Sequence, residues 1–314
     1  MKPTRRRNRK YILGVDIGGT KCALVLANEK MRIYDRLSFP TQPKRGWKRI
    51  LKQLFAFIDE IILRNHLKLP SICKAGISCG GPLDSHRGLI LSPPNLPGWN
   101  KVPIVRMLQK KLHCPVRLEN DAYACAVAEW KFGAGRGCRN MVFLTFGTGL
   151  GAGLILNDRL YRGANDMAGE AGHIRLAEDG PVGYGKKGSF EGFCSGGGIA
   201  RGAKEAGVNT NSAKELFEAA SRGDKASRRI LQESANYLGL GLSILIDLLN
   251  PERIIMGGIY SRNEKFFRSA ALKVIRKETL SRSRSVCQIL PAGLGEKIGD
   301  IASLSVALID ELDG

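Results

Sequence analysis

Several features that define common protein classes are missing from this sequence. It contains no run of about 18 apolar residues, so we expect no transmembrane helix. The eight cysteines include no C-x-x-C pair and lie mostly in apolar surroundings, which favours reduced, buried thiols over a disulfide framework or a zinc knuckle. No apolar segment of signal-peptide character follows the first ten residues. We therefore expect a cytoplasmic protein with no membrane partner.

Acidic residues are also scarce. The chain has 49 Lys and Arg against 29 Asp and Glu, a formal net charge of +20. Such a balance raises nucleic acid, a membrane surface or an anionic small molecule as partner. Residues 1–10, "MKPTRRRNRK", carry six positive charges and no acid. We interpret this segment as a disordered basic tail, with nucleic-acid contact as the less favoured alternative.

Glycine, in contrast, is abundant: 38 of 314 residues, against an average usage of about 7%. Much of it forms short clusters, which indicate tight turns and close approach of the backbone to ligands. The hydrophobic content of 43% supports a substantial core. The length fits one large domain or two ordinary ones.

The glycine clusters follow apolar, strand-like segments in a repeated pattern. A strand, turn and strand surround "DIGGTK" at 16–21, and a second copy surrounds "TFGTGLGAG" at 145–153. A helical stripe is predicted at 46–67, two long helices at 225–250 and 264–278, and a C-terminal helix at 298–312. Strands alternating with helices, together with a repeated glycine hairpin, predict a duplicated α/β fold with a ligand between its halves.

The hexamer "DIGGTK" combines groups that can hold a nucleotide's phosphates. Backbone N–H groups at Gly18 and Gly19 and the Thr20 hydroxyl can donate to phosphate oxygens, and Lys21 adds positive charge. Asp16 can hold Mg²⁺ directly or through water. The spacing is not that of a Walker motif. Taken alone, the hexamer fits an ordinary glycine hairpin equally well.

Two further glycine turns favour the phosphate interpretation. Thr145 and the segment Gly147, Thr148, Gly149 can close on the phosphates from the opposite side. Gly257 and Gly258 in "IIMGGI" suit a flat base or ribose lying against the backbone. Three such turns, each at the end of an apolar strand, favour nucleotide binding over coincidence.

Asn120 and Asp121 stand at a predicted junction between a strand and a helix. In one interpretation, Asp121 is the N-cap of that helix, a common use of aspartate. In the other, Asp121 accepts a proton from a substrate hydroxyl while the Asn120 amide orients the same substrate. Both roles can hold together.

A further candidate is His173, which lies between Glu170 and Glu191 in the loop-rich segment 168–193. A histidine without a second ring or thiol at ligand spacing is more often structural than functional. Metal ligand, catalytic base, substrate contact and packed side chain all remain open for His173 at this point.

The motifs taken together resemble the ROK family (repressors, open reading frames and kinases) of the actin-like ATPase superfamily. The resemblance extends from about residue 11 to the C-terminus. It rests on six motifs in the family's order: "DIGGTK", "GPLD", "SPPNLPGW", "END", "FGTGLGAGLILNDRLYRGAN" and "GEAGH". It implies a duplicated actin-like (ribonuclease H-like) fold with an interdomain cleft. The small domain would comprise residues 11–120 plus about 300–314, and the large domain 121–299.

The resemblance also implies an ATP-dependent sugar kinase that uses Mg²⁺. Asp121 would be the general base and Asp16 would position magnesium, directly or through water. The sugar would be bound by Asp121 and by a set of amides, carboxylates and one imidazole: Asn95, Asn120, Glu170, His173 and Glu191. The substrate would be a hexose such as glucose, or fructose, or an N-acetylhexosamine, and we expect a homodimer.

The family also contains sugar-responsive repressors, so a non-catalytic sugar-sensing or nucleic-acid-binding protein is the alternative function. Those repressors carry a winged helix-turn-helix before the phosphate motif. Only fifteen residues precede Asp16 here. We therefore favour the kinase and expect no nucleic-acid partner despite the charge.

One departure from the family pattern concerns zinc. Family members commonly carry C-x-C-G-x-x-G-C-x-E after the Gly-His pair, and its three thiolates join the histidine on a structural zinc. This chain has Val182, Tyr184 and Ser189 at the thiol positions. Because valine cannot bind zinc and hydroxyls bind it poorly, we predict no structural zinc. Packing of Tyr184 with Phe190 and Phe193 is our hypothesis for what orders the loop instead.

Overall fold

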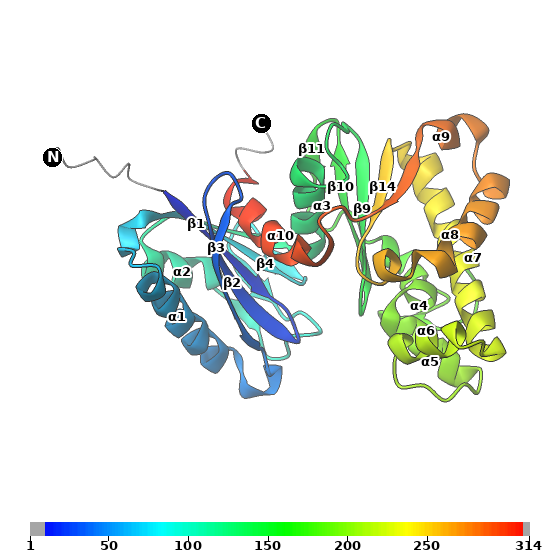
Figure 1. Cartoon of the computed structure of the whole chain (residues 1–314), viewed down its shortest axis with the longest axis horizontal. Coiled ribbons are helices and arrows are strands. Elements are labelled where there is room, and N and C mark those ends of the chain that lie inside the picture. The colour runs from blue at the N-terminus through cyan, green and yellow to red at the C-terminus, as the bar shows by residue number, and fades with distance from the viewer. Residues whose placement is uncertain (1–9, 310–314) are drawn as a thin grey trace. The chain divides into compact units, whose positions relative to one another are not determined.

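The computed structural model describes residues 10–309 and divides the chain into two compact units (Figure 1). Unit 1 comprises the described residues up to Ala128 and those from Glu296 onward. Unit 2 comprises Glu129–Gly295. Most of the predicted basic tail, residues 1–9, and residues 310–312 of the predicted C-terminal helix lie outside the described residues. Each unit is described by itself.

Unit 1 is built on a five-stranded sheet with the order β3-β2-β1-β4-β8. Its strands are β1 (Tyr11–Ile17), β2 (Lys21–Ala27), β3 (Ile33–Pro40), β4 (Ile72–Cys79) and β8 (Val116–Asn120), with a small sheet of β5 (Leu83–Asp84), β6 (Leu89–Leu91) and β7 (Asn100–Val102). Its helices are α1 (Trp47–Arg64), α2 (Ile104–Leu112), α10 (Ile298–Ala307), the start of α3 (Asp121–Phe132), and the short turns η1 (Pro43–Arg45), η2 (Leu69–Ser71) and, apart from its first residue, η4 (Gly295–Lys297).

Helices cover both faces of this sheet, α1 and α2 on one and α10 on the other (Figure 1). Leu13 and Val15 of β1 face α1 and join the core formed with its apolar stripe. The alternate residue Gly14, and Gly76 beside it in β4, face α10. A Cβ atom on either glycine would collide with α10. These glycines therefore let the C-terminal helix pack directly on the backbone of the central strands.

Unit 2 is built on a second five-stranded sheet, in the order β11-β10-β9-β14-β15. Its strands are β9 (Met141–Phe146), β10 (Leu150–Leu156), β11 (Arg159–Tyr161), β14 (Arg253–Met256) and β15 (Gln288–Pro291), with a hairpin of β12 (Val182–Gly183) and β13 (Lys186–Lys187). Its helices are α4 (Phe190–Cys194), α5 (Gly196–Glu205), α6 (Ala213–Ser221), α7 (Lys225–Leu249), α8 (Ile259–Glu278), α9 (Ser281–Val286) and the single turn η3 (Ala171–His173).

The two sheets repeat one pattern. In each, three consecutive strands pair antiparallel (β1 to β3, β9 to β11). A later strand then pairs in parallel with the first of them (β4 with β1, β14 with β9), and a last strand pairs in parallel with that one (β8 with β4, β15 with β14). The predicted glycine hairpins occupy the same place in both, between the first and second strands. The predicted helix 225–250 corresponds to α7, whose N-cap Asp224 accepts a hydrogen bond from the Ser227 N–H (2.7 Å). The expected duplicated α/β architecture is confirmed.

A buried carboxylate joins the two ends of unit 2. Glu129 is fully buried, and its Oε2 accepts hydrogen bonds from the backbone N–H groups of Ala134 (2.8 Å) and Gly293 (3.0 Å). Its Oε1 accepts a third from Leu294 (2.9 Å). Backbone donors thus satisfy a side chain that would be costly to bury alone.

Among the described residues, no helix is both long enough and apolar enough to span a bilayer.

Candidate functional site

In unit 1, the predicted site residues gather at the carboxyl ends of three adjacent parallel strands. The register pairs Ile17 of β1 with Cys79 of β4, and Cys79 with Asn120 of β8, so these strands end at one edge of the sheet. Asp16 is the penultimate residue of β1, and Asp121 directly follows β8. Ligands of open α/β sheets bind at such an edge.

The "DIGGTK" turn is closed by its own backbone and fastened from outside. The Gly18 N–H donates to the Lys21 carbonyl (3.0 Å), which forms the tight turn between β1 and β2. Thr41 then holds it twice: its hydroxyl donates to the Gly18 carbonyl (2.6 Å) and its N–H to the Thr20 carbonyl (3.0 Å). Thr20 and Lys21 remain exposed. The turn is therefore fixed while its hydroxyl and ammonium groups are available to a ligand.

Two asparagine side chains lie against glycine backbone at this edge. A Cβ atom added to Gly19 would lie 2.8 Å from Cβ of Asn95, and one added to Gly80 would lie 3.3 Å from its Nδ2. One added to Gly81 would lie 2.9 Å from Nδ2 of Asn120. Close approach explains the glycines in both turns, and it brings Asn95 and Asn120 to the same edge as Asp16 and Asp121.

Asn120, not Asp121, holds the N-cap position of α3. Its Oδ1 accepts a hydrogen bond from the Ala122 N–H (2.9 Å), and the helix begins at Asp121. The Asp121 side chain keeps solvent access. Burial of the surrounding region nevertheless raises the pKa of its carboxyl group, partly offset by the nearby backbone N–H groups of Ala122 and Asp121. A solvent-accessible carboxylate with a raised pKa is suited to accept a proton.

Asp16 carries an unusual charge environment. Burial, then the negative charges of Asp121 and Asp300, raise its pKa to about 7, against the opposing influence of Lys21 and Arg36. The three neighbouring carboxyl groups of Asp16, Asp121 and Asp300 create a negative potential that suits a cation such as Mg²⁺. Proteins commonly bind Mg²⁺ through one or two carboxylates together with substrate phosphates. Within residues 10–309, no group of three or more His, Cys, Asp or Glu side chains could hold a metal ion. Oxygen atoms of water or of substrate phosphates can complete the coordination of a magnesium ion beside Asp16.

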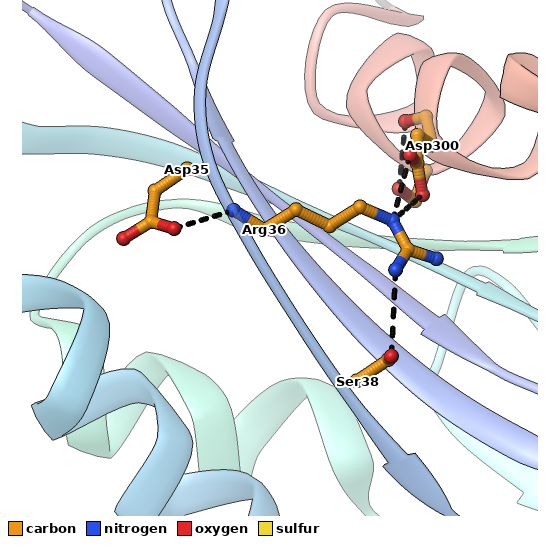
Figure 2. A network of polar contacts seen from close by, with 5 residues as sticks. Asp35, Arg36, Ser38 and Asp300 are labelled. Atoms are coloured by element: carbon orange, nitrogen blue, oxygen red, sulfur yellow. Dashed lines mark hydrogen bonds and ion pairs between the residues drawn. The ribbon is translucent and has the colours of Figure 1, made fainter.

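An ion pair that sequence analysis missed supports the Asp16 end of β1. Figure 2 shows Arg36 of β3 reaching across the sheet to Asp300 in the first turn of α10, with Nε donating to both carboxylate oxygens (3.0 and 2.9 Å). Its Nη1 donates to the Ser38 hydroxyl (3.4 Å). The preceding residue, Gly299, borders Asp16: an added Cβ would lie 3.5 Å from Oδ2 of Asp16. In the sequence, the pair Gly299–Asp300 near the start of the predicted C-terminal helix is the feature that could have indicated this contact.

In unit 2, the predicted nucleotide-binding glycines also come together. Gly147–Gly149 form the turn from β9 to β10, and Gly257 and Gly258 directly follow the neighbouring strand β14. The Gly257 N–H donates to the Leu144 carbonyl (2.9 Å), and a Cβ atom on Gly258, whose φ is 62°, would collide with the Phe146 carbonyl. The two turns are thus neighbours at one sheet edge.

The hydroxyl of Thr145 has a structural partner. It accepts a hydrogen bond from the Gly151 N–H (2.9 Å) across the β9–β10 pair. This bond fixes the hairpin that presents Thr148, so any contact of Thr145 with phosphate would use a hydroxyl that is already engaged.

A third glycine cluster, which sequence analysis did not single out as a site, belongs to the same edge. The N–H groups of Gly196 and Gly197, at the start of α5, donate to the carbonyls of Gly147 (2.8 Å) and Thr148 (3.2 Å). A Cβ atom on Gly197 would lie 3.1 Å from the Thr148 carbonyl oxygen. The glycines therefore allow a helix terminus to clamp the predicted phosphate turn.

The segment "GEAGH" lies along β10. The Ala152 N–H donates to the Gly169 carbonyl (2.9 Å), and a Cβ on Gly169 or Gly172 would collide with β10 carbonyls. Close backbone packing thus explains both glycines. The side chains of Glu170 and His173 are exposed.

The third predicted sugar ligand of this unit, Glu191, lies beside the same segment. A Cβ atom on Gly172 would lie 3.3 Å from Cβ of Glu191. Its Oε2 accepts a hydrogen bond from the Leu150 N–H (3.0 Å) at the end of the glycine turn. Unit 2 thus brings Glu191 to both the histidine segment and the predicted phosphate turn.

The hypothesis that Tyr184 packs with Phe190 and Phe193 is wrong. Tyr184 is 61% exposed, whereas Phe193 stacks on Tyr237 with ring centroids 3.4 Å apart. Phe190 is buried against Gly241 of α7. The reason is local: Tyr184 occupies the turn of the β12–β13 hairpin with φ of 47°, which directs it away from the core.

Polar contacts order this loop. Arg175 Nη1 donates to the carbonyls of Lys187 (3.0 Å) and Glu178 (3.2 Å), and Lys186 Nζ donates to the His173 carbonyl (2.8 Å). The buried Ser189, at one of the three positions that the resemblance assigned to thiols, caps α4 by accepting from the Gly192 N–H (3.1 Å). Cation-to-carbonyl hydrogen bonds hold together the segment that carries His173.

Comparison with known proteins shows which family has this arrangement. The ROK family pattern matches residues 12–308. A glucokinase from Halalkalibacterium halodurans is 32% identical over 270 residues, 81% of each chain. The ROK hexokinase structure from Thermus thermophilus is 31% identical with a TM-score of 0.83, covering 97% of this chain and 100% of that one. A ROK glucokinase from Streptomyces griseus, solved with glucose and AMPPNP, is 30% identical with a TM-score of 0.77, covering 95% and 99%.

These similarities confirm the predicted actin-like fold, because the hexokinase structure superposes over almost the full length of both chains. They also extend across the strand ends and glycine turns described above. The chain belongs to the ROK family, and within it resembles the glucokinases.

Proposed function

We propose that this protein is an ATP-dependent kinase of a free hexose, with glucose as the first candidate and Asp121 as general base. The observation that carries the proposal is the position of Asp121 in unit 1. Its accessible carboxylate stands at the carboxyl end of β8, beside Asn120 and on the same sheet edge as Asp16 and the "DIGGTK" turn. The glucose and AMPPNP bound by the Streptomyces griseus relative support the choice of substrates.

In the proposed reaction, Asp121 takes the proton of a sugar hydroxyl while that oxygen attacks the terminal phosphorus of ATP. The new phosphorus–oxygen bond forms as the bond to the ADP oxygen breaks. Asp16 would hold Mg²⁺, which neutralises developing charge on the phosphates when bound. The "DIGGTK" turn would contribute Lys21, the Thr20 hydroxyl and backbone donors to the same phosphates.

We assign the remaining predicted ligands by their chemistry. Asn95 and Asn120 of unit 1, and Glu170, His173 and Glu191 of unit 2, offer amide, carboxylate and imidazole groups that suit sugar hydroxyls. The glycine turns at 147–149 and 257–258 of unit 2 offer backbone to the nucleotide. The two units would be the small and large domains of the enzyme. A cytoplasmic homodimer without structural zinc completes the proposal.

One observation favours the alternative, a nucleic-acid-binding protein. No acid occurs from 36 to 58, and five exposed cations occupy η1 and the first turns of α1: Lys44, Arg45, Lys48, Arg49 and Lys52. Positive charge at a helix N-terminus is locally unfavourable, so such a cluster fits an anionic partner. Binding to duplex DNA with a steep salt dependence, weakened by Lys48→Gln/Arg49→Gln, would support this function.

The deciding experiment measures ADP release with glucose, fructose, N-acetylglucosamine and N-acetylmannosamine, each beside Asp121→Asn. We expect sugar-dependent turnover with glucose and its loss in the variant. Turnover on no sugar, combined with salt-sensitive DNA binding, would replace the kinase proposal with the alternative. Elemental analysis after zinc loading tests the zinc prediction separately, since one tightly held zinc per chain would contradict it.

A further inference from the structure

His173 lies at the end of a short 3-10 turn and not within a long helix or strand. It ends the single turn η3, where its N–H donates to the Glu170 carbonyl (3.1 Å). Its side chain is exposed. An imidazole that selects a sugar must hold one orientation, because a small displacement of a contact group weakens binding of the substrate. In this segment some other group must therefore fix the histidine.

Two residues of the β12–β13 hairpin contact His173 directly. Lys186 Nζ donates to the His173 carbonyl (2.8 Å). The Tyr184 ring meets the imidazole edge-on, with centroids 6.1 Å apart and an interplanar angle of 86°. One contact holds the backbone of the histidine and the other holds its ring. Together they restrain both the position and the rotation of the imidazole.

The conformation of Tyr184 is a second, independent observation. The hairpin turn consists of Tyr184 and Gly185, with φ of 47° and 75°. Two-residue turns with both φ values positive strongly prefer Asn or Gly at the first position. A tyrosine there carries a conformational cost, because its Cβ crowds the backbone in the left-handed region. The contact of its ring with His173 is a reason to keep tyrosine at this position.

The hairpin is itself anchored, so it can act as a support. Arg201 Nε donates to the Val182 carbonyl (3.0 Å), and Arg175 Nη1 donates to the Lys187 carbonyl (3.0 Å). The Ser189 hydroxyl donates to the Gly183 carbonyl (3.3 Å). Three hydrogen bonds thus fasten the hairpin to α5, to the strand-like segment after His173 and to the start of α4.

From these contacts we propose that Lys186 and Tyr184 are positioning residues, which hold His173 in the orientation that binds the sugar without any metal. The inference rests on the proposed sugar-binding role of His173. Lys186 fixes the carbonyl end of η3 and Tyr184 sets the ring. Neither residue is assigned a contact with the substrate.

The test compares Lys186→Met with Lys187→Met, a matched change one residue away. Lys187 points to a surface ion pair with Asp179, at 66% side-chain exposure, and not to His173. We expect Lys186→Met to raise the glucose KM about tenfold, the size of one lost charge-assisted hydrogen bond, with little change in the ATP KM. Lys186→Arg should restore much of the loss. Lys187→Met should behave as the wild type.

Tyr184→Gly separates positioning from stability. Glycine suits the turn better than tyrosine, so a purely structural role predicts an equal or higher melting temperature and an unchanged glucose KM. The positioning role predicts a raised glucose KM without loss of stability. An unchanged glucose KM in both Tyr184→Gly and Lys186→Met would overturn the proposal.

A spectroscopic readout keeps this inference distinct from the proposed function. The imidazole signals of His173, assigned by comparison with His173→Gln, should shift or broaden in Lys186→Met and Tyr184→Gly but not in Lys187→Met. If the wild type phosphorylates no sugar, the kinase proposal fails while these spectra still decide whether the hairpin holds the ring. Identical His173 signals in Lys186→Met and Lys187→Met would refute the positioning role.

Discussion

Glu191 Oε2 accepts a hydrogen bond from the Leu150 N–H at 3.0 Å, which ties a proposed sugar ligand to the strand leaving the glycine turn 147–149. Glu191→Ala removes both the carboxylate and this tie, so we expect it to raise the KM of glucose and of ATP, each by about tenfold or more. Glu191→Gln keeps an oxygen for Leu150, so its effect should fall mainly on glucose. Steady-state kinetics with each substrate varied in turn measures the difference. Equal effects of both variants on the ATP KM would contradict this coupling.

Asp121 and Asn120 can be separated by mutation because their roles differ. Asp121→Asn should lower kcat by about 10² to 10⁴, the usual contribution of a general base, with an unchanged melting temperature. Asn120→Ala removes the N-cap of α3 and should destabilise the protein by about 1 kcal/mol. Thermal unfolding beside kinetics distinguishes the two. A large fall in melting temperature for Asp121→Asn would instead mean that its carboxylate supports the fold.

The raised pKa of Asp121 predicts the acid side of the pH–rate profile. A general base acts in its deprotonated form, so activity falls as pH falls through its pKa. Because burial raises that pKa, kcat/KM for the sugar should begin to fall at a higher pH than an ordinary aspartate would give. The profile should be measured at saturating Mg²⁺, because the neighbouring Asp16 is the proposed magnesium ligand. An acid limb at the pH of an unperturbed carboxyl group would argue against Asp121 as the base.

Asp16 predicts a pH-dependent stability of the magnesium-free protein. Its pKa is about 7 in the folded chain against 3.8 as the ordinary value, so the folded state holds this proton more tightly than the unfolded state. The resulting stability is fully present below about pH 4 and is lost as pH rises to about 7. Asp16→Asn should therefore raise the melting temperature more at pH 8 than at pH 5.5. A gain that is equal at both values would show that Asp16 is not the titrating group.

The sequence predicted local features better than long-range partners. The glycine turns and α7 have strong local signals, namely paired glycines after apolar runs and a long helical stripe. The contact of Arg36 with Asp300 joins residues 264 positions apart, and no periodicity reports it. The clamp of Gly196 on Gly147 similarly depends on how α5 meets the sheet.

Small shifts in local geometry explain the remaining differences. Asn120 takes the capping position that sequence analysis considered for its neighbour Asp121, because the helix starts one residue earlier, at Asp121, directly after the strand. Tyr184 was expected in the core because it is aromatic and lies near two phenylalanines. Its left-handed turn conformation directs it toward His173 instead.

The Glu129 carboxylate has a consequence for how unit 2 is placed along the chain. Glu129 is the first residue of unit 2, and its carboxylate accepts hydrogen bonds from Gly293 and Leu294, close to the last residue of that unit. The two ends of unit 2 therefore lie close together. The main sheet of unit 1, and α10 packed on it, come entirely from residues outside 129–295. Unit 2 is therefore one continuous segment with its ends close together, placed in the chain between the two stretches of unit 1, and α3 runs across the first boundary.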